Sequence, residues 1–379
     1  MMAVYWTIFI YTTVVSLLCS KSNSYKYNSK ISDDMYYNSQ RVGIIGGLLS
    51  FAVLIFFIGV RSYVADTSAY IFSFENSVNT LADIPTILRS DEKGVLFQAY
   101  MVFFKNCISN NYTDWLMSLA IFHGFAVSHF FGKYSEDFGF SSYLFIASGA
   151  FTWMQNGIRQ FTAACVILLA IDFLFKKRRI IFCLFVIIAF YIHTTAIIWL
   201  VFAFLVQGEV LNKKVIFAII GAVLCVVFVD AFTNVLTGAL ENTNYAGATE
   251  QFEEDDGVNP ITTLIYAIPV IIAFWKRKFI LTLERPMYID VMINMSCVAT
   301  AVSLIGNFTS GILFGRLPVY FSLGNFIVLP WLINNCFDNN NKSIMKFCCY
   351  AGYFAYFLYY MYISCGGMQY YSVIRTFNC

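Results

Sequence analysis

Residues Asn156-Gly157-Ile158-Arg159-Gln160 lead directly into a mostly apolar run from Phe161 to Phe175. A guanidinium at the mouth of a lipid-facing helix is costly to keep dry, and arginine cannot lose its proton to reduce that cost. We therefore expect Arg159 to point into a watery cavity, towards a negative group. Arg61, just after one apolar run, and Arg316, just before another, stand at equivalent edges.

The composition is that of a membrane protein. Only 12% of the 379 residues are charged, whereas 59% are hydrophobic; a soluble domain carries about 25% charged residues. The net charge of +2 argues against a nucleic-acid partner. The 11 cysteines include no CxxC pair, so we expect neither a disulfide framework nor a metal site, and no cofactor.

The apolar runs predict the fold class. A hydrocarbon core about 30 Å thick needs roughly 20 apolar residues from each spanning helix. We expect an all-α polytopic integral membrane protein with about 12 transmembrane helices in a single domain, residues 1–379. The expected spans lie near residues 3–19, 42–60, 113–132, 140–155, 158–175, 179–192, 195–207, 214–236, 260–275, 288–306, 317–334 and 346–365.

Two regions of this pattern are shorter than a span. The runs 179–192 and 195–207 are short enough to form a re-entrant pair that never fully crosses. The segment 94–108 is apolar but contains Lys105. An interfacial helix fits this segment better than a span.

Basic residues set the expected orientation. No Lys or Arg precedes the run at 3–19, which favours a retained first helix with its N-terminus outside. This topology leaves 17 of the 24 basic residues on the cytoplasmic side, as the positive-inside rule requires. Two longer loops, approximately 61–112 and 237–259, then face outwards. The seven basic residues expected outside are Arg61, Arg89, Lys93, Lys105, Arg159, Arg316 and Arg375.

Three of these outer residues are the edge arginines Arg61, Arg159 and Arg316. Arginine presents a planar fork of donors that matches phosphate oxygens, so the three together predict an anion site. The alternative is snorkelling, in which each side chain simply reaches the outer headgroups. Three arginines on the face that should be poor in basic residues favour the anion site.

His193 interrupts an apolar run at the same expected level. It can be a packing residue hydrogen-bonded to a neighbour, a general base or a phosphate donor. Asp66 and Tyr70 follow Arg61 by five and nine residues. They can form a local ion pair that orients the arginine, or offer a base. The sequence leaves these alternatives open.

Taken in order, these elements resemble the pattern of one family. They are Arg61-x4-Asp66-x3-Tyr70-x-Phe72, then Glu92, then Asn156-Gly157-Ile158-Arg159-Gln160, then His193-Thr194-Thr195-Ala196. Their order and spacing, over about residues 40–210, resemble those of EpsG-like, Wzy-type bacterial polysaccharide polymerases. Arg316, ahead of Tyr320 and Phe321, is similar to the late arginine of that family.

The resemblance implies a membrane-embedded, metal-independent glycosyltransferase of the bacterial inner membrane, with its active site facing outwards. Such polymerases join undecaprenyl-diphosphate-linked oligosaccharide repeat units, as donor and acceptor, during O-antigen (lipopolysaccharide) or exopolysaccharide biosynthesis. Further expected partners are membrane lipid and a chain-length regulator protein.

The resemblance also implies roles for individual residues. The expected ligands of the substrate diphosphate are Arg61, Arg159 and Arg316. The candidate catalytic bases are His193 first, and Asp66 or Glu92 second. The expected supporting residues are Tyr70, Asn156 and Gln160.

Two other functions remain open. An O-antigen ligase-like transferase would use the same donor and the same kind of diphosphate site with a different acceptor. The order of the motifs favours the polymerase. A flippase or exporter of the same lipid would need charges along a path through both leaflets, or repeated halves. Here the charges at helix edges concentrate on the expected outer side, and no convincing internal repeat is present.

Overall fold

The structure is a computed structural model that describes residues 2–23, 42–228, 238, 257–308, 314–364 and 368–374. Most of the expected outer loop 237–259 lies outside the described residues, as do Arg41 and Arg375. The chain forms two compact units, residues 1–200 with 343–379 and residues 201–342. Each unit is described by itself.

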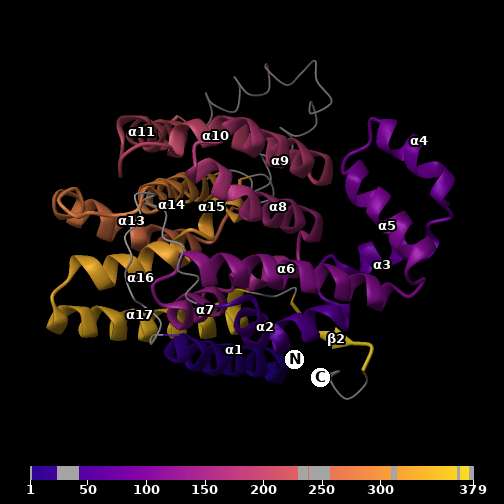
Figure 1. Ribbon diagram of the computed structural model, residues 1–379, viewed down its shortest axis with the longest axis horizontal. Coiled ribbons are helices and arrows are strands. Elements are labelled where there is room, and N and C mark those ends of the chain that lie inside the picture. The colour runs from indigo at the N-terminus through magenta and orange to yellow at the C-terminus, as the bar shows by residue number, and fades with distance from the viewer. Residues whose placement is uncertain are drawn as a thin grey trace. The chain divides into compact units, whose positions relative to one another are not determined.

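The first unit is a bundle of helices with one pair of short strands (Figure 1). Its elements are α1 (Met2–Asn23), α2 (Ile44–Gly59), β1 (Arg61–Tyr63), α3 (Thr67–Asn76), α4 (Ile84–Arg89), α5 (Val95–Cys107), α6 (Tyr112–Tyr134), α7 (Phe138–Ala147), α8 (Ile158–Phe175), α9 (Arg179–Ile192), α17 (Asn339–Tyr359) and β2 (Tyr371–Ser372). Short 3-10 turns lie at Leu81–Asp83, Ala150–Met154 and Thr194–Ile198, and a π-helical turn at Tyr360–Ser364. The boundaries between the units fall inside α10 (Trp199–Val206) and in the first turn of α17.

Helices α2 and α6 pack closely because glycines line their contact. A Cβ on Gly59 of α2 would lie 2.5 Å from the sulfur of Met117, and a Cβ on Gly124 of α6 would overlap Ile55. Small residues at such contacts let helix backbones approach where there is no hydrophobic force between apolar helices. This packing fixes the end of α2, and with it the segment that begins at Arg61.

The chain's last described residues are fastened to that same end of α2. Strand β2 pairs antiparallel with β1, with Arg61 opposite Ser372. The Tyr370 hydroxyl donates to the Phe57 carbonyl at 2.8 Å, and the Ser372 hydroxyl donates to the Val60 carbonyl at 3.0 Å. The last carbonyls of a helix have no partner within the helix, so the end of α2 finds donor partners in the last described residues; the Val60 carbonyl also accepts from the Val373 N–H at 3.0 Å.

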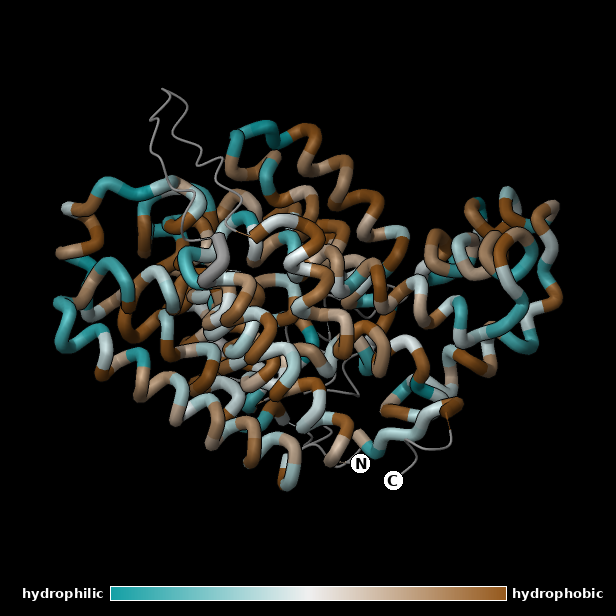
Figure 2. Tube along the Cα trace, turned by 60° about the horizontal axis from the view of Figure 1, so that its bottom comes forward, coloured by the Kyte–Doolittle hydropathy of each residue, from teal (hydrophilic) through white to brown (hydrophobic). Residues whose placement is uncertain are grey.

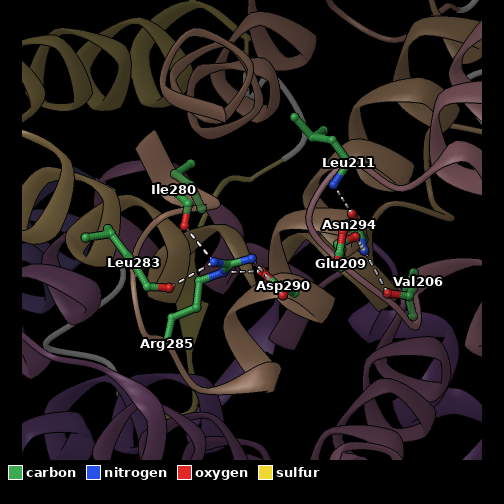
Figure 3. Close-up of polar contacts among 8 residues, drawn as sticks. All are labelled: Val206, Glu209, Leu211, Ile280, Leu283, Arg285, Asp290 and Asn294. Carbon is green, nitrogen blue, oxygen red and sulfur yellow. Dashed lines mark hydrogen bonds and ion pairs between the residues drawn. The ribbon is translucent and has the colours of Figure 1, made fainter. Parts of the chain in front are cut away.

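The second unit is arranged around α14 (Met287–Gly306), which is buried along most of its length. The elements packed against α14 are α11 (Lys213–Val227), α13 (Pro260–Ile280), α15 (Val319–Ser322) and α16 (Asn325–Cys336). Asn294 of α14 donates to the carbonyls of Val206 and Glu209 at 2.9 and 3.1 Å, and accepts from the Leu211 N–H at 2.9 Å (Figure 3). Leu211 has a φ of 52°, a conformation that is unfavourable for a residue with a Cβ, so Asn294 holds a strained turn.

A second polar cluster precedes the same helix. Arg285 donates from Nε to Asp290 Oδ1 at 2.6 Å and from its NH2 group to Oδ2 at 3.2 Å (Figure 3). Its NH1 group donates to the carbonyls of Ile280 and Leu283 at 2.6 and 3.1 Å. The two-pronged ion pair therefore closes the turn between α13 and α14.

The structure confirms a helical protein with almost no sheet, but not twelve spans. Among the described residues, the helices long and apolar enough to cross a membrane are Met2–Ser20, Tyr112–Tyr134, Ile158–Phe175 and Met287–Gly306. The expected span 317–334 is divided between α15 and α16, and α5 has only 13 residues. In Figure 2 the helices are mainly brown or pale, and teal residues gather at helix ends and turns. The expected single domain over residues 1–379 stays a prediction.

Replacing Asn294 by leucine should destabilise the second unit strongly. The change leaves the carbonyls of Val206 and Glu209 and the N–H of Leu211 without their partner, and each buried unpaired group costs about 1–3 kcal/mol. The measurement is the apparent unfolding temperature of the purified protein in detergent. Ser296→Ala on the same helix is the control, because the buried Ser296 hydroxyl donates only to the Met292 carbonyl of its own helix. Equal losses in the two variants would contradict the assigned role of Asn294.

Candidate functional site

The predicted site residues of the first unit gather at the start of α8. Gly149 and Gly157 have φ values of 72° and 74°, and the 3-10 turn Ala150–Met154 lies between them. Glycine reaches these values without strain, so the chain turns out of α7 and begins α8 afresh at Ile158. The first N–H groups of a helix have no partner within it and carry a partial positive charge. The start of α8 therefore favours a negative group.

Asp66 supplies one such group. Its Oδ2 accepts a hydrogen bond from the Gly157 N–H at 2.9 Å, across 91 positions of sequence. Asp66 also precedes the first residue of α3. The carboxylate therefore attaches the segment that follows α2 to the beginning of α8.

Arg61 is buried, with only 1% of its surface exposed. Its Nε donates to the Thr67 hydroxyl at 2.9 Å, and its NH1 group donates to the Ile58 carbonyl. Burial lowers the pKa of Arg61 to about 10, and the negative charge of Asp66 opposes that shift. Arg61 therefore remains charged at neutral pH, while two of its donors are engaged within the protein.

Arg159 is half-buried in the first turn of α8. Its NH1 group donates to the Lys93 carbonyl at 3.4 Å, and its guanidinium carbon lies 6.0 Å from the centre of the Tyr70 ring. Its Nε is buried and has no hydrogen-bond partner. A buried, unpaired donor on a charged group is expensive, so Arg159 retains a donor for a ligand.

Gly94 permits this arrangement around Arg159. It has a φ of 79° and precedes the first residue of α5. A Cβ at Gly94 would lie 3.2 Å from the Arg159 NH1 nitrogen and 3.0 Å from the Ile192 carbonyl oxygen. The start of α5 can therefore approach both the guanidinium and the end of α9.

His193 follows the last residue of α9 and lies beside α8. Its Nδ1 is 2.8 Å from the Thr195 hydroxyl, and Gln160 Nε2 donates to the same hydroxyl at 3.5 Å. Thr195 thus joins His193 to Gln160, the residue next to Arg159. The imidazole is half-buried.

Tyr70 lies between the charges of the site. Burial raises its pKa, the charge of Asp66 raises it further, and Arg159 opposes the shift. The phenol is therefore neutral near pH 7 and offers a ring face to the guanidinium, an arrangement that stabilises a desolvated cation.

The other predicted residues take varied places. Glu92 is exposed in the turn before α5, next to Lys93. Asn156 is half-buried, and its N–H donates to the Thr152 carbonyl at 2.9 Å. Arg316 is half-buried in the turn before α15 and belongs to the second unit. The expected meeting of Arg316 with Arg61 and Arg159 stays a prediction.

Sequence reasoning gave no role to Thr195 or Gln155. Thr195 was part of the quoted motif, and a hydroxyl two residues after a histidine could have been recognised as its hydrogen-bond partner. Gln155 is fully buried, and neither amide atom has a partner. Such groups are rare and often belong to functional sites, but nothing in the sequence distinguishes Gln155 from other polar residues near helix ends.

A family model described as the EpsG family matches residues 44–373. The chain belongs to the EpsG family. The match extends past the motifs to β2 at Tyr371–Ser372, so the EpsG chain includes the strand that is fastened beside Arg61. EpsG membership indicates a membrane protein of polysaccharide polymerase type. No curated protein and no solved structure matched the chain.

The part of the chain that the structure describes holds no group of three or more His, Cys, Asp or Glu side chains that could bind a metal ion. The positive groups near the start of α8 include Arg61, Arg159 and the helix N-terminus itself.

Arg159→Lys should impair polysaccharide synthesis nearly as much as Arg159→Ala. Lysine keeps the charge but loses the planar donors, at a cost of about 2–4 kcal/mol of transition-state stabilisation. The measurement is the length distribution of surface polysaccharide at matched protein levels. The controls are Arg89→Lys and Arg89→Ala, because Arg89 is exposed at the end of α4. If Arg159 only anchors the protein in headgroups, the lysine variant will give normal chains.

Proposed function

We propose that this protein is a polysaccharide polymerase that joins undecaprenyl-diphosphate-linked repeat units at the outer face of the bacterial inner membrane. The observation that carries the proposal is the start of α8. There Arg159 is half-buried and its Nε has no hydrogen-bond partner. The next residue, Gln160, donates to the Thr195 hydroxyl, which also lies within hydrogen-bond distance of His193. EpsG membership supports the same class of reaction.

The reaction needs a base and fixed positive charge, and both kinds of group lie near the start of α8. A hydroxyl oxygen at the non-reducing end of the acceptor unit attacks the anomeric carbon of the growing chain. The bond between that carbon and the diphosphate oxygen breaks, and the diphosphate leaves with the bonding electron pair on its lipid. The hydroxyl proton passes to a base. Fixed cations that face the leaving diphosphate stabilise the charge as it develops.

The roles proposed for the arginines follow from how far each side chain is buried and how many of its N–H donors are already engaged. Arg159 is the main diphosphate ligand, because it is half-buried and keeps an unpaired donor. Arg61 is buried with two donors engaged, so it acts through its charge and by positioning Asp66 and α3. Arg316 remains a proposed further ligand. His193 is the proposed base, and Asp66 or Glu92 is the second candidate.

The outer face is proposed from the charges of the sequence. With the N-terminus outside, 17 of the 24 basic residues face the cytoplasm, and Arg61 and Arg159 face outwards. A polymerase at that face would meet repeat units after they cross the membrane. The proposed substrates are then both the donor and the acceptor lipid, with a chain-length regulator as a further proposed partner.

Deletion of the gene tests the proposal directly. We expect single repeat units on the carrier or on the final acceptor, and no long chains. The measurement is a gel of surface glycans beside a lipid-linked fraction. Full-length chains that remain on the carrier would indicate a ligase, and units trapped on the inner leaflet would indicate a flippase. Either result would overturn the polymerase.

Variants of His193 test the proposed base on the same gel. If His193 accepts the proton, His193→Ala lowers the rate by about 10²–10⁴-fold, seen as a collapse to short chains. His193→Gln should be equally inactive, since glutamine keeps a hydrogen-bonding group near Thr195 but is no base. Tyr191→Ala is the control, because Tyr191 is 48% exposed two residues away. Normal chains from the glutamine variant would restrict His193 to hydrogen bonding and move the proposed base to Asp66 or Glu92.

A further inference from the structure

The first unit contains a cavity of about 580 Å³ beside the candidate site. A volume of this size is typical of a small-molecule site. The wall is built from one face each of α4, α5, α6 and α8 and the last residue of α9. Most lining side chains are apolar, and four of them are aromatic: Phe97, Tyr100, Phe103 and Phe122.

The cavity begins one helical turn from Arg159. Thr162 and Val166 of α8 line the wall, three and seven residues after Arg159. On a helix these positions share a face with Arg159 and extend about 10 Å from it. Ile192 also lines the cavity, and its carbonyl faces Gly94 beside the Arg159 guanidinium. A ligand held by Arg159 therefore has an apolar chamber directly next to its charged group.

The hydroxyls in the wall have their protons engaged within the protein. Tyr100 and Ser118 are 2.7 Å apart, and Ser118 donates to the Trp115 carbonyl at 2.6 Å. Thr162 donates to the Ile158 carbonyl at 2.8 Å and lies 2.8 Å from His123 Nε2. No hydroxyl proton of the wall remains to donate to a ligand. The chamber thus suits pure hydrocarbon and disfavours a buried ester carbonyl, which would stay unpaired.

We infer that this chamber holds the first isoprene units of a polyisoprenyl diphosphate, whose phosphates lie at Arg159. This inference rests on the proposed function for the identity of the carrier. In a polyisoprenyl diphosphate the hydrocarbon is bonded directly to the phosphate oxygen. In a glycerophospholipid, two esters separate phosphate from acyl chains, and they would fall where the wall has no donor to offer. Between Arg159 and Thr162 the site changes from a charged group to an apolar wall within one helical turn, which fits a polyisoprenyl diphosphate.

The chamber opens where its wall is exposed. Leu88 of α4 and Phe103 of α5 line it and are 44% and 45% exposed. The chamber is too small for a long polyisoprenyl chain, so the distal units leave between α4 and α5 and continue in the bilayer. Its role is to fix the hydrocarbon nearest the diphosphate, which orients the leaving group against Arg159.

Photocrosslinking in bacterial membranes tests the occupant. The full-length protein carries p-benzoylphenylalanine in place of Phe103, a change that keeps an aromatic ring. The control carries it in place of Phe347, which is 71% exposed on α17. After illumination, mass spectrometry should find polyisoprenyl adducts at position 103 and bulk phospholipid adducts at position 347. Phospholipid adducts alone at position 103 would overturn the inference.

A cavity-filling variant tests affinity independently. Ala99 lines the chamber, so Ala99→Trp should weaken binding of sugar-free undecaprenyl diphosphate to the purified protein in lipid nanodiscs by about tenfold or more. Ala355→Trp on an exposed position of α17 is the matched control and should leave the affinity unchanged. Thermal unfolding of both variants checks that they are folded. Unchanged affinity in folded Ala99→Trp would overturn the inference.

These outcomes separate the inference from the proposed function. If deletion shows a ligase or a flippase while polyisoprenyl adducts form at position 103, the chamber stands and the polymerase fails. If deletion gives single repeat units while position 103 captures only phospholipid, the polymerase stands and the chamber fails.

Discussion

The contact on which the site depends is the hydrogen bond from the Gly157 N–H to the Asp66 carboxylate. It joins the segment after α2 to the beginning of α8, two regions that the chain separates by 91 positions. It also keeps a negative charge near Arg61, whose guanidinium is buried and remains protonated. A buried charge without a nearby counter-charge is costly. The burial of Arg61 and the position of the start of α8 therefore both depend on Asp66.

Glycines allow the helices and turns of the first unit to come close enough for these contacts. Gly59 and Gly124 bring α2 against α6, which fixes the position of Arg61. Gly94 brings the start of α5 against Arg159 and the end of α9. A Cβ at Gly59 or Gly124 would overlap the side chains of Met117 and Ile55, and a Cβ at Gly94 would meet the Ile192 carbonyl. The geometry of the charged groups is thus a consequence of backbone packing.

Hydropathy singled out Arg61 and Arg159, but it did not predict the architecture around them. Arginine at the edge of an apolar run must find a polar surrounding, so Arg61 and Arg159 could be identified from hydropathy alone. The burial of Arg61 could not be predicted, because nothing in the sequence marks its hydrogen-bond partners, the Thr67 hydroxyl and the Ile58 carbonyl. The pairing of β1 with β2 was also missed, since strands of three and two residues carry no periodic signal.

The expected twelve spans are not confirmed, for a related reason. Hydropathy measures the apolar length of a run but does not register where a helix breaks. The run 317–334 is interrupted between α15 and α16, and the run 140–155 contains the end of α7 and a 3-10 turn. Gly149 and Gly157 mark the second interruption, but a glycine in an apolar run can equally pack inside a continuous helix. Only tertiary contacts decide between the two.

The break between α7 and α8 is what makes a site possible. A continuous helix would pair every N–H group internally and leave no positive end at this place. Because α8 begins afresh at Ile158 inside the protein, its N-terminus, Asp66 and Arg159 meet beside the apolar chamber. Interrupted helices whose N-termini face anionic groups occur in transporters for the same physical reason. Here the interruption places a fixed positive end and an arginine against hydrocarbon, where a charge interacts more strongly than in water.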